Sequence, residues 1–407
     1  MKSFKMTPTS YMDDCLSGEN SLDRAKTVTD NLVSSMARGG FSFKGFTFSG
    51  ERPPKNLTED GESVLVAGLK WYSEGDFMKL NIQELNFNKK CRGRKAGDKG
   101  DISSRVITKR DCAKVVAEVF DPMGKLAPII AGMKLDISIL HQRGIDWDDP
   151  IPAELKTIWA ANFDLIKELG TLQFRRAIVP ENAASLDIET IDTADAGENL
   201  VCAAIYARFK LRGGGHSCQL IFARTKIVHD ITIPRAELVA ALLNASTGHI
   251  VKMSLKHLFV RNWKLTDSQV VLHWINSMKS QLKQFIRNRL IEILRLTKRE
   301  DWMYVPSSEN VADIGTRKGA QLVDVDSSSP WRIGHPWMSG EEKDFPLQSV
   351  EDIILSGQEK NTFKKECIID DVLATFDIHC YTKYVPNELG ERYKFCNYLV
   401  DPNKYRF

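Results

Sequence analysis

The sequence predicts a multidomain chain of α/β and α+β type, whose best-defined part is a mixed five-stranded sheet covered by helices. The chain has 407 residues, enough for two or three domains of about 150 residues each. Three successive strand patterns separated by turn residues favour antiparallel pairing, and they span 186–195, 200–211 and 218–228. A helix from Pro234, a strand at 258–266, two helices and a strand at 302–306 follow, and such β/α alternation extends the same sheet.

The remaining parts of the chain differ in pattern, and we expect four segments in order. Residues 1–90 alternate one helix with short strands in an α+β pattern, and 91–180 combine a basic linker with helical periodicity. The sheet occupies 181–320, and the tail at 321–407 has a weakly encoded structure. Because the part after residue 340 contains no strand or helix that the sheet obviously requires, we expect the core at 186–318 to fold without it.

Composition excludes several classes of protein. Lys and Arg number 56 against 53 Asp and Glu, so the net charge of +3 identifies no partner by itself. The eight cysteines form no C-x-x-C pair, which favours reduced thiols in an intracellular protein, cytoplasmic or nuclear. The N-terminus lacks the apolar stretch of a signal peptide, and no apolar run is long enough to span a bilayer, so we expect no membrane partner.

Four carboxylates lie where strands of the predicted sheet end or helices begin: Asp195, Glu237, Asp267 and Asp313. An acid flanked by apolar sequence at such a place is costly unless it is solvated, paired or bound to metal. A single one is usually a helix cap, whereas four on successive elements of one sheet favour a metal site. Carboxylate oxygens suit Mg²⁺, with Mn²⁺ as an alternative, and two such ions about 3.5–4 Å apart stabilise a phosphoryl displacement. The pattern therefore favours nuclease-like chemistry.

Several phrases occur in a characteristic order and spacing: YMDDCLSGENSLDRA, VVAEVFDPMGKLAPII, ADAGENLVCAAIY, IPRAELVAALL, TDSQVVLHWI and VPSSENVADIGTRKG. Together they resemble the Pol polyprotein of Bel/Pao-type LTR retrotransposons, the Pao retrotransposon peptidase family, from about residue 9 to residue 338. The resemblance implies a ribonuclease H domain over 181–320, an RNA·DNA hybrid as its substrate, and other parts of the retroelement polyprotein as partners.

By this resemblance the four acids match the D-E-D-D set of ribonucleases H. Asp195 would bridge two Mg²⁺ ions, Glu237 and Asp267 would complete the first metal site, and Asp313 would bind the second ion. The histidine that some ribonucleases H carry before the last acid is missing from residues 297–313. Its absence affects the expected rate more than the chemistry, because the metals do most of the charge stabilisation.

The YMDD sequence near the N-terminus resembles motif C of reverse transcriptases, in which a tight hairpin presents two aspartates to metal. It comprises Tyr11, Met12, Asp13 and Asp14. A polymerase also needs the motif A aspartate and fingers, which do not fit in the upstream residues. We therefore expect residues 1–90 to be the last part of a palm with a vestigial motif, followed by a thumb-like or connection-like helical segment.

Two basic stretches leave alternatives open. Residues 87–114 contain ten Lys and Arg against three Asp, as a solvated linker or a phosphate-contacting segment would. In a helical pattern at 279–300, Lys283, Arg287 and Arg295 lie roughly on one face. That face is either the solvated side of an amphipathic core helix or a surface that contacts the phosphates of the hybrid.

Two classes of function remain. The first is a metal-dependent endoribonuclease that cuts the RNA strand of RNA·DNA hybrids, and the second is a catalytically silent, nucleic-acid-binding remnant of the retroelement. The intact set of four acids favours the enzyme. A protease is disfavoured, because the tripeptide Asp192-Thr193-Ala194 resembles the D-T-G of retroviral aspartic proteases but has alanine in place of the required glycine.

Overall fold

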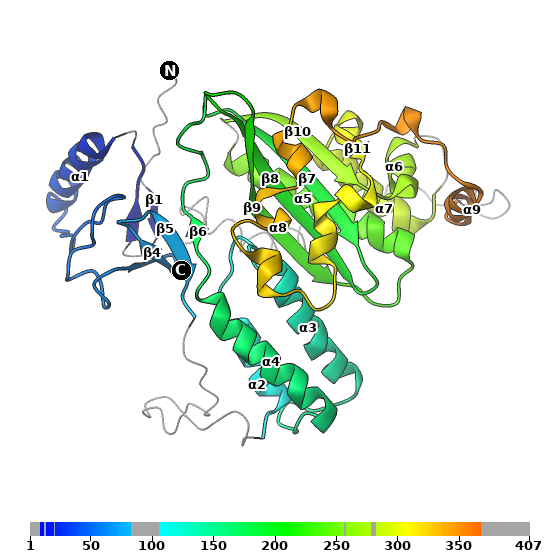
Figure 1. Ribbon diagram of the computed structural model, residues 1–407, viewed down its shortest axis with the longest axis horizontal. Coiled ribbons are helices and arrows are strands. Elements are labelled where there is room, and N and C mark those ends of the chain that lie inside the picture. Colours follow the sequence, from blue (N-terminus) through cyan, green and yellow to red (C-terminus); the bar gives the residue numbers. More distant parts are fainter. Residues whose placement is uncertain are drawn as a thin grey trace. The chain divides into compact units, whose positions relative to one another are not determined.

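The computed structural model of the chain describes residues 9–11, 14–19, 21–82, 106–255, 258–277 and 282–367 (Figure 1). The chain separates into two compact units. The first comprises the described residues of Met1–Asn81 and Gln173–Arg176, and the second those of Ile82–Leu172 and Ala177–Ile369.

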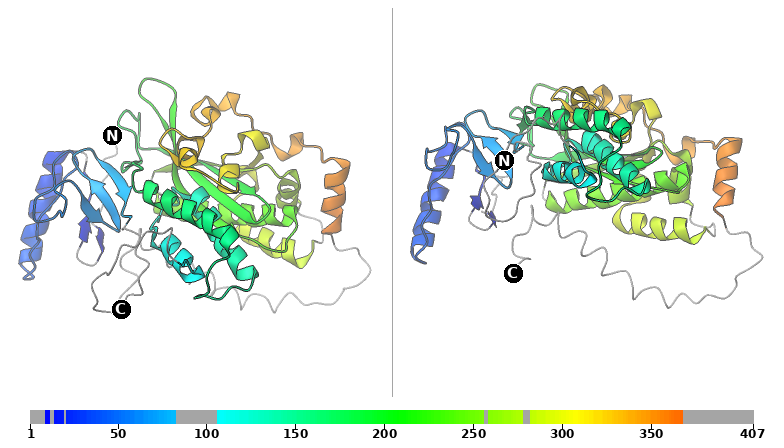
Figure 2. Two further views of the ribbon diagram at one scale, coloured as in Figure 1. Left: turned by 60° about the horizontal axis from the view of Figure 1, so that its bottom comes forward. Right: turned by 90° about the horizontal axis from the view of Figure 1, so that it is seen from below.

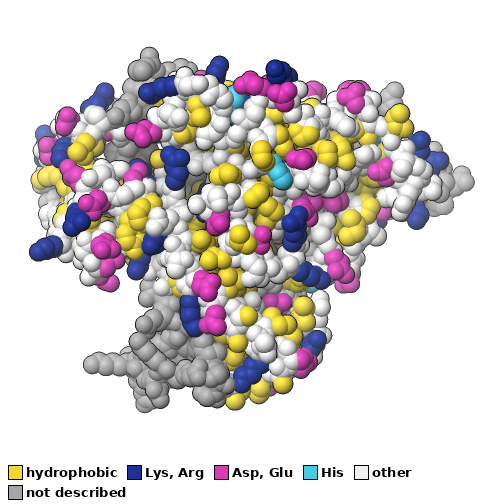
Figure 3. All heavy atoms as spheres, viewed as in Figure 1, with side chains coloured by type: hydrophobic (Ala, Val, Ile, Leu, Met, Phe, Trp, Pro, Cys, Tyr) yellow, Lys and Arg dark blue, Asp and Glu magenta, His cyan; other side chains and the backbone are white. Residues whose placement is uncertain are grey.

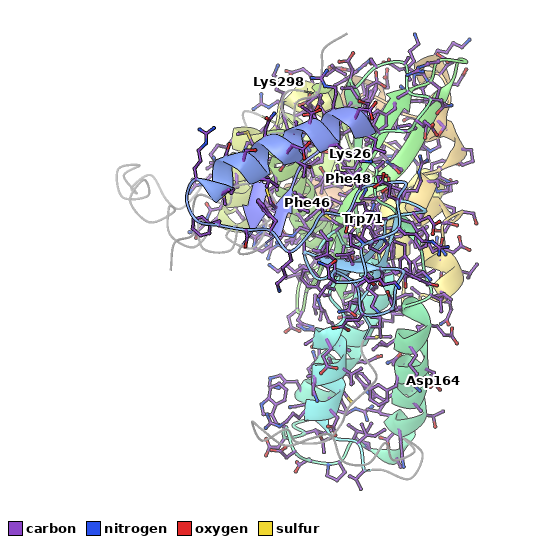
Figure 4. The ribbon with its side chains drawn as sticks, turned by 90° about the vertical axis from the view of Figure 1, so that its left-hand side faces the viewer. Lys26, Phe46, Phe48, Trp71, Asp164 and Lys298 are labelled. Carbon is purple, nitrogen blue, oxygen red and sulfur yellow. The ribbon has the colours of Figure 1, made fainter. Side chains whose placement is uncertain are left out.

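The first unit is small and of α+β type. It holds an antiparallel hairpin of β1 (Thr9–Tyr11) and β2 (Asp14–Leu16), the helix α1 (Leu22–Ala37), and a four-stranded antiparallel sheet of β3 (Val64–Val66), β4 (Leu69–Tyr72), β5 (Phe77–Leu80) and β6 (Phe174–Arg175). Ser21 caps α1, and Lys26 of that helix pairs with Glu51 and lies over the ring of Phe48 (Figure 4). These described elements do not by themselves establish a reverse-transcriptase palm.

The second unit is built on a five-stranded mixed sheet. Its strands are β7 (Ile188–Ala196), β8 (Leu200–Lys210), β9 (His216–Ile227), β10 (Phe259–Thr266) and β11 (Trp302–Tyr304), in the order β11-β10-β7-β8-β9. Strands β7, β8 and β9 pair antiparallel, whereas β10 runs parallel to β7 and β11 parallel to β10. The predicted mixed five-stranded sheet is therefore confirmed.

Helices cover both faces of this sheet. The α-helices that precede β11 are α2 (Lys109–Glu118), α3 (Ala127–Gln142), α4 (Ala153–Leu169), α5 (Ile233–Ser254), α6 (Gln269–Asn276) and α7 (Gln284–Leu296). Val201 of β8 packs with alanines of α5, whereas the preceding residue, Leu200, packs with Leu135 of α3. α3 and α5 therefore lie on opposite faces of the sheet (Figure 2). Burial on both faces explains the nearly continuous apolar sequence of β8.

Short helices and turns after β11 complete the unit. They are η3 (Ser307–Glu309), η4 (Val311–Gly315), η5 (Leu322–Val325), α8 (Pro330–Ile333), η6 (Pro336–Ser339), η7 (Glu342–Asp344), η8 (Val350–Asp352) and α9 (Gly357–Lys365), and η2 (Arg299–Asp301) precedes β11. The side chain of Trp331 is fully buried, and its carbonyl accepts a hydrogen bond of 2.8 Å from the hydroxyl of Tyr206 in β8.

The described part of the segment after residue 340 packs on the core, which its sequence pattern did not indicate, and the expectation that 186–318 folds without it stays a prediction. Gln348 pairs with Tyr304 at the edge of β11, and Arg208 of β8 donates a hydrogen bond to the carbonyl of Gly340. Ile353 is 6% exposed and packs in one cluster with Trp274 and Trp302. These contacts come from single residues at irregular spacing, so neither the helical nor the strand period reveals them.

The surface matches the balanced composition of the chain. On the face drawn in Figure 3, Lys and Arg side chains are interspersed with Asp and Glu side chains. Among the described helices, none is both long enough and apolar enough to cross a membrane.

A pair of adjacent isoleucines tests the packing of the C-terminal segment. Ile353→Ala should lower the free energy of unfolding by about 2–4 kcal/mol, because it removes a buried side chain from the cluster around Trp274. Ile354→Ala is the matched control, since Ile354 is 86% exposed and should change stability by less than about 0.5 kcal/mol. Denaturant unfolding of the full chain measures both, and equal values for the two variants would contradict the packing.

Candidate metal centre

Three of the four predicted acids meet at one edge of the five-stranded sheet. Asp195 lies near the carboxyl end of β7, and Asp267 directly follows β10, the parallel neighbour of β7. Glu237 comes from the beginning of α5, which packs on β7 and β8. One carboxylate oxygen from each of the three lies within 4.8 Å of the others. The carboxyl ends of parallel strands lie at the same edge of a sheet, which is why acids so distant in sequence converge.

The oxygens of this group fit a divalent cation. The side chains of Asp195 and Glu237 are only 6% and 9% exposed. Glu237 Oε2 and Asp267 Oδ1 are buried and accept no hydrogen bond from the described residues. Buried polar atoms without a partner are rare because they lose their hydration without compensation. Hard carboxylate oxygens in this state are the donors that Mg²⁺ or Mn²⁺ takes.

Burial and mutual repulsion raise the pKa values of all three acids. Burial is the largest cause for Asp195, whose pKa rises to about 7, and the charge of Asp267 adds to the effect. The pKa of Glu237 lies well above its usual value because of burial and then because of Asp267 and Asp195. Burial also raises the pKa of Asp267. A bound cation would favour the ionised carboxylates, so the group is better suited to holding a metal than to remaining empty.

The fourth acid, Asp313, lies close by but is engaged differently. It belongs to η4, and its Oδ2 accepts two hydrogen bonds from the guanidinium of Arg317, one of them 2.7 Å long from Nε. Its side chain is 37% exposed. Its charge nevertheless contributes to the raised pKa values of Asp195 and Asp267, so it belongs to the same electrostatic neighbourhood.

Three residues that support the acids were not singled out from the sequence. The hydroxyl of Thr316 donates to Asp195 Oδ2, and the buried amide of Asn310 donates to the carbonyl of Ala194 at 2.9 Å. Hydrogen bonds from the side chains of Ser307 and Asn310 oppose the rise in the pKa of Asp267. All three supporting residues lie in the phrase VPSSENVADIGTR, but only the return of the chain onto β7 and β8 gives them these roles.

The close approach of this returning segment depends on Gly315. A Cβ atom at that position would lie 2.3 Å from the Sγ of Cys202 in β8, far inside van der Waals contact. Glycine therefore lets η4 reach the sheet directly opposite Asp195, which is the register partner of Cys202. The position of Thr316 follows from this packing.

The other candidate residues are placed as follows. Met12 and Asp13 lie outside the described residues, and of Tyr11 and Asp14 only the backbone is described, as register partners of the β1–β2 hairpin. The basic stretch is described only from residue 106 onward.

The three basic residues of α7 are on or beside one helix. Lys283 is its N-cap and donates through Nζ to the carbonyl of Lys365, Arg287 is exposed, and Arg295 pairs with Glu292 at 2.6 Å. The two alternatives for this helix, a solvated face and a phosphate-contacting surface, stay predictions.

Asp192, the aspartate of the protease-like tripeptide, is 1% exposed and pairs with the buried Lys264 at 2.7 Å. A carboxylate enclosed in an ion pair cannot reach a substrate. The structure therefore gives this residue a structural role and further disfavours a protease.

Part of the second unit matches a known protein family. Residues 108–268 match the family described as Pao retrotransposon-like RNaseH-like domain. The match includes Asp195, Glu237 and Asp267, whereas Asp313 lies beyond it. No curated protein matches the sequence.

Two solved structures are similar to part of the chain. RNase H1 from the halophilic archaeon Halobacterium salinarum NRC-1 is 16% identical, with 31% of this chain and 90% of that chain covered and a TM-score of 0.22. The N-terminal RNase H domain of rv2228c from Mycobacterium tuberculosis, fused to maltose binding protein, is 13% identical, with 32% and 94% covered and a TM-score of 0.23. The residues that match the RNaseH-like domain family include β7, β8, β9 and β10 of the five-stranded mixed sheet.

The raised pKa values predict an unusual dependence of stability on pH. At Asp195, the folded, metal-free chain binds more protons than the unfolded chain between the ordinary carboxylate pKa, about 4, and the folded pKa, about 7. The contribution of Asp195 to the free energy of unfolding should therefore fall as pH rises through this window. Asp195→Asn removes this contribution, so the variant should become increasingly more stable than wild type from pH 4 to pH 7.

Thermal unfolding in the presence of a chelator measures the effect, with the exposed Glu198→Gln as the control. Adding Mg²⁺ at neutral pH should stabilise the wild type and Glu198→Gln but not Asp195→Asn. Parallel pH profiles for wild type and Asp195→Asn would contradict the electrostatic account of the site.

Proposed function

We propose that this chain contains a metal-dependent endoribonuclease that cuts the RNA strand of RNA·DNA hybrids. The observation that carries the proposal is the convergence of Asp195, Glu237 and Asp267, with two buried oxygens that lack hydrogen-bond partners. The match of the surrounding residues to a Pao retrotransposon-like RNaseH-like domain supports it. Such a domain indicates a nucleic-acid-related hydrolase. Its proposed substrate is the RNA·DNA hybrid, and its proposed cofactor is a divalent metal ion.

In the proposed mechanism, Asp195, Glu237 and Asp267 would hold one divalent ion, and Asp313 would help to hold a second. Bound Mg²⁺ supplies Lewis-acid stabilisation and lowers the pKa of a bound water. Thr316 orients Asp195 by donating to one carboxylate oxygen, which leaves the other free for metal. Asn310 ties the end of β7 to the segment that carries Asp313. These hydrogen bonds fix the acids before a metal binds, which reduces the reorganisation that binding requires.

Recognition of the hybrid would use its backbone rather than its bases. Contacts to 2′-hydroxyl groups distinguish an RNA strand from a DNA strand, and phosphates attract basic side chains. Lys283, Arg287 and Arg295 are the candidates for phosphate contact on this chain. Other parts of a retroelement polyprotein are the proposed protein partners.

A catalytically silent nucleic-acid-binding remnant is the second candidate function. The observation that favours it is the ion pair between Asp313 and Arg317, which occupies the fourth acid. The two candidates differ in one measurable respect, because only the enzyme needs a divalent metal to cut RNA.

The principal test is Asp195→Asn in the full chain. Asn keeps the shape of the side chain but loses the charge that holds metal, so cutting of the RNA strand should fall by more than the roughly 10–100-fold typical for the loss of an outer partner of a metal. Binding of the hybrid should stay nearly unchanged or become slightly tighter, because repulsion between acid and phosphate decreases. A hybrid-cleavage assay with and without Mg²⁺, together with a binding titration, measures both quantities.

Glu198→Gln is the matched control, because Glu198 lies three residues further along the chain and its side chain is 76% exposed. It should cut like wild type. RNase activity that persists in Asp195→Asn, or that needs no metal, would rule out this site. Hybrid binding by a wild-type chain that does not cut would favour the remnant.

The full chain should not extend a primer on an RNA template, because the YMDD residues supply only part of a two-metal polymerase site. Asp13→Asn should accordingly change neither RNA cutting nor hybrid binding. Template-dependent nucleotide incorporation by the purified chain would contradict the interpretation of Tyr11–Asp14 as a vestigial motif.

A further inference from the structure

Arg317 lies beside the metal centre, where it pairs with Asp313. Among the described residues, no other Lys or Arg forms an ion pair with one of the four acids. Two N–H groups of Arg317 donate to the same oxygen, Asp313 Oδ2. The preceding residue, Thr316, binds Asp195. The dipeptide Thr316–Arg317 therefore contacts two of the four acids at once.

The ion pair and a metal compete for the same carboxylate. While Arg317 donates twice to Asp313 Oδ2, that oxygen is not free for a cation, and the positive guanidinium repels a second ion. The free chain thus offers a ready site for one ion, at Asp195, Glu237 and Asp267, whereas at Asp313 the Oδ2 atom is engaged and Arg317 offsets the negative charge.

Arg317 is also able to leave this pair. Its side chain is 64% exposed, and Asp313 is 37% exposed, so the pair lies in a region where water screens the attraction. A guanidinium binds phosphate with the same forked geometry with which it binds a carboxylate. A phosphate of a nucleic acid strand brought to the metal centre is therefore an alternative partner for Arg317.

We propose that Arg317 is a positioning residue that acts through Asp313 and couples substrate binding to the second metal. In the free chain it holds Asp313 in the ion pair. When a backbone phosphate arrives, Arg317 transfers its hydrogen bonds to the phosphate, and Asp313 becomes available to a second divalent ion. This inference rests on the proposed function, and it adds that the substrate itself controls occupancy of the second metal site.

Mn²⁺ binding to the full chain tests the coupling, with calorimetric titration as the readout. The titrations are made alone and with an RNA·DNA hybrid whose RNA strand carries 2′-O-methyl groups, so that it is not cut. Wild type should bind one Mn²⁺ ion in the absence of the hybrid and a second one more tightly in its presence. Arg317→Gln should bind the second ion more tightly without the hybrid, by up to about fivefold as expected for loss of an exposed ion pair, and the hybrid should add less.

Lys318→Gln is the matched control. Lys318 is the next residue in the chain, is 63% exposed, and pairs at 3.2 Å with Glu198, which is not an acid of the centre. It should titrate like wild type. Arg317→Lys keeps the charge but not the fork, so it should lie between wild type and Arg317→Gln. In this series the affinity for the second Mn²⁺ ion increases when Arg317 is replaced. Damage to the site would decrease that affinity, so a merely structural role of Arg317 would not produce the result.

The outcomes separate this inference from the proposed function. If wild type cuts a cleavable hybrid but Arg317→Gln binds Mn²⁺ as wild type does, or more weakly, only the role of Arg317 is overturned. If Lys318→Gln gives the same gain as Arg317→Gln, general surface charge explains the effect and the inference fails. If wild type neither binds Mn²⁺ nor cuts, both the inference and the proposed function are overturned.

Discussion

The crowding of carboxylates at one buried edge of the sheet is the constraint on which the rest of the second unit depends. Each acid loses hydration on burial, and each repels the others, so the metal-free centre opposes folding. The surrounding segment offsets this cost with donors: the hydroxyl of Thr316 to Asp195, the amide of Asn310 to Asp267 and the guanidinium of Arg317 to Asp313. All three come from the chain that returns after β11, and this explains why that segment must pack so closely on β7 and β8.

A second polar cluster lies in the interior of the same three elements, β7, β10 and α5. Asp192 of β7 pairs with Lys264 of β10, which also donates to Asn244 of α5 at 3.1 Å. Asp192 and Lys264 each precede an acid of the centre by three residues on their own strand, and Asn244 lies on the helix that carries Glu237. A Cβ atom at Gly248 would stand 2.2 Å from Asp192 Oδ2, so glycine makes the space for this pair. Buried ion pairs contribute little net stability, but they fix register. Here the pair fixes the relative positions of the elements from which the acids project.

Sequence patterns were sufficient for the sheet and for the location of the acids. Apolar runs located β7, β8 and β9, and the β/α alternation placed the later strands in the same sheet. That Asp195 and Asp267 lie at the ends of neighbouring parallel strands is known only from the structure. The residues that donate hydrogen bonds to the acids could not be predicted from these patterns. The roles of Thr316 and Arg317 depend on how an irregular segment folds back onto the sheet. The same reason hid the packing of Trp331 and Ile353, which follow no helical or strand period. Asp192 shows that a local motif can also mislead, because its sequence resembles a protease motif. Only the structure shows that it is buried in an ion pair with Lys264.

The sign of the charge at the centre constrains the order of events in the proposed reaction. The chain as a whole carries a net charge of only +3, and on the face drawn in Figure 3 its basic and acidic side chains are interspersed. The acids themselves repel phosphate once they are ionised. A first cation would remove that repulsion and would favour the ionised form of Asp195 and Asp267, whose pKa values burial raises. Metal binding at Asp195, Glu237 and Asp267 should therefore precede productive contact with the scissile strand, and the more exposed Asp313, neutralised by Arg317 until then, is the acid that remains available for the later step.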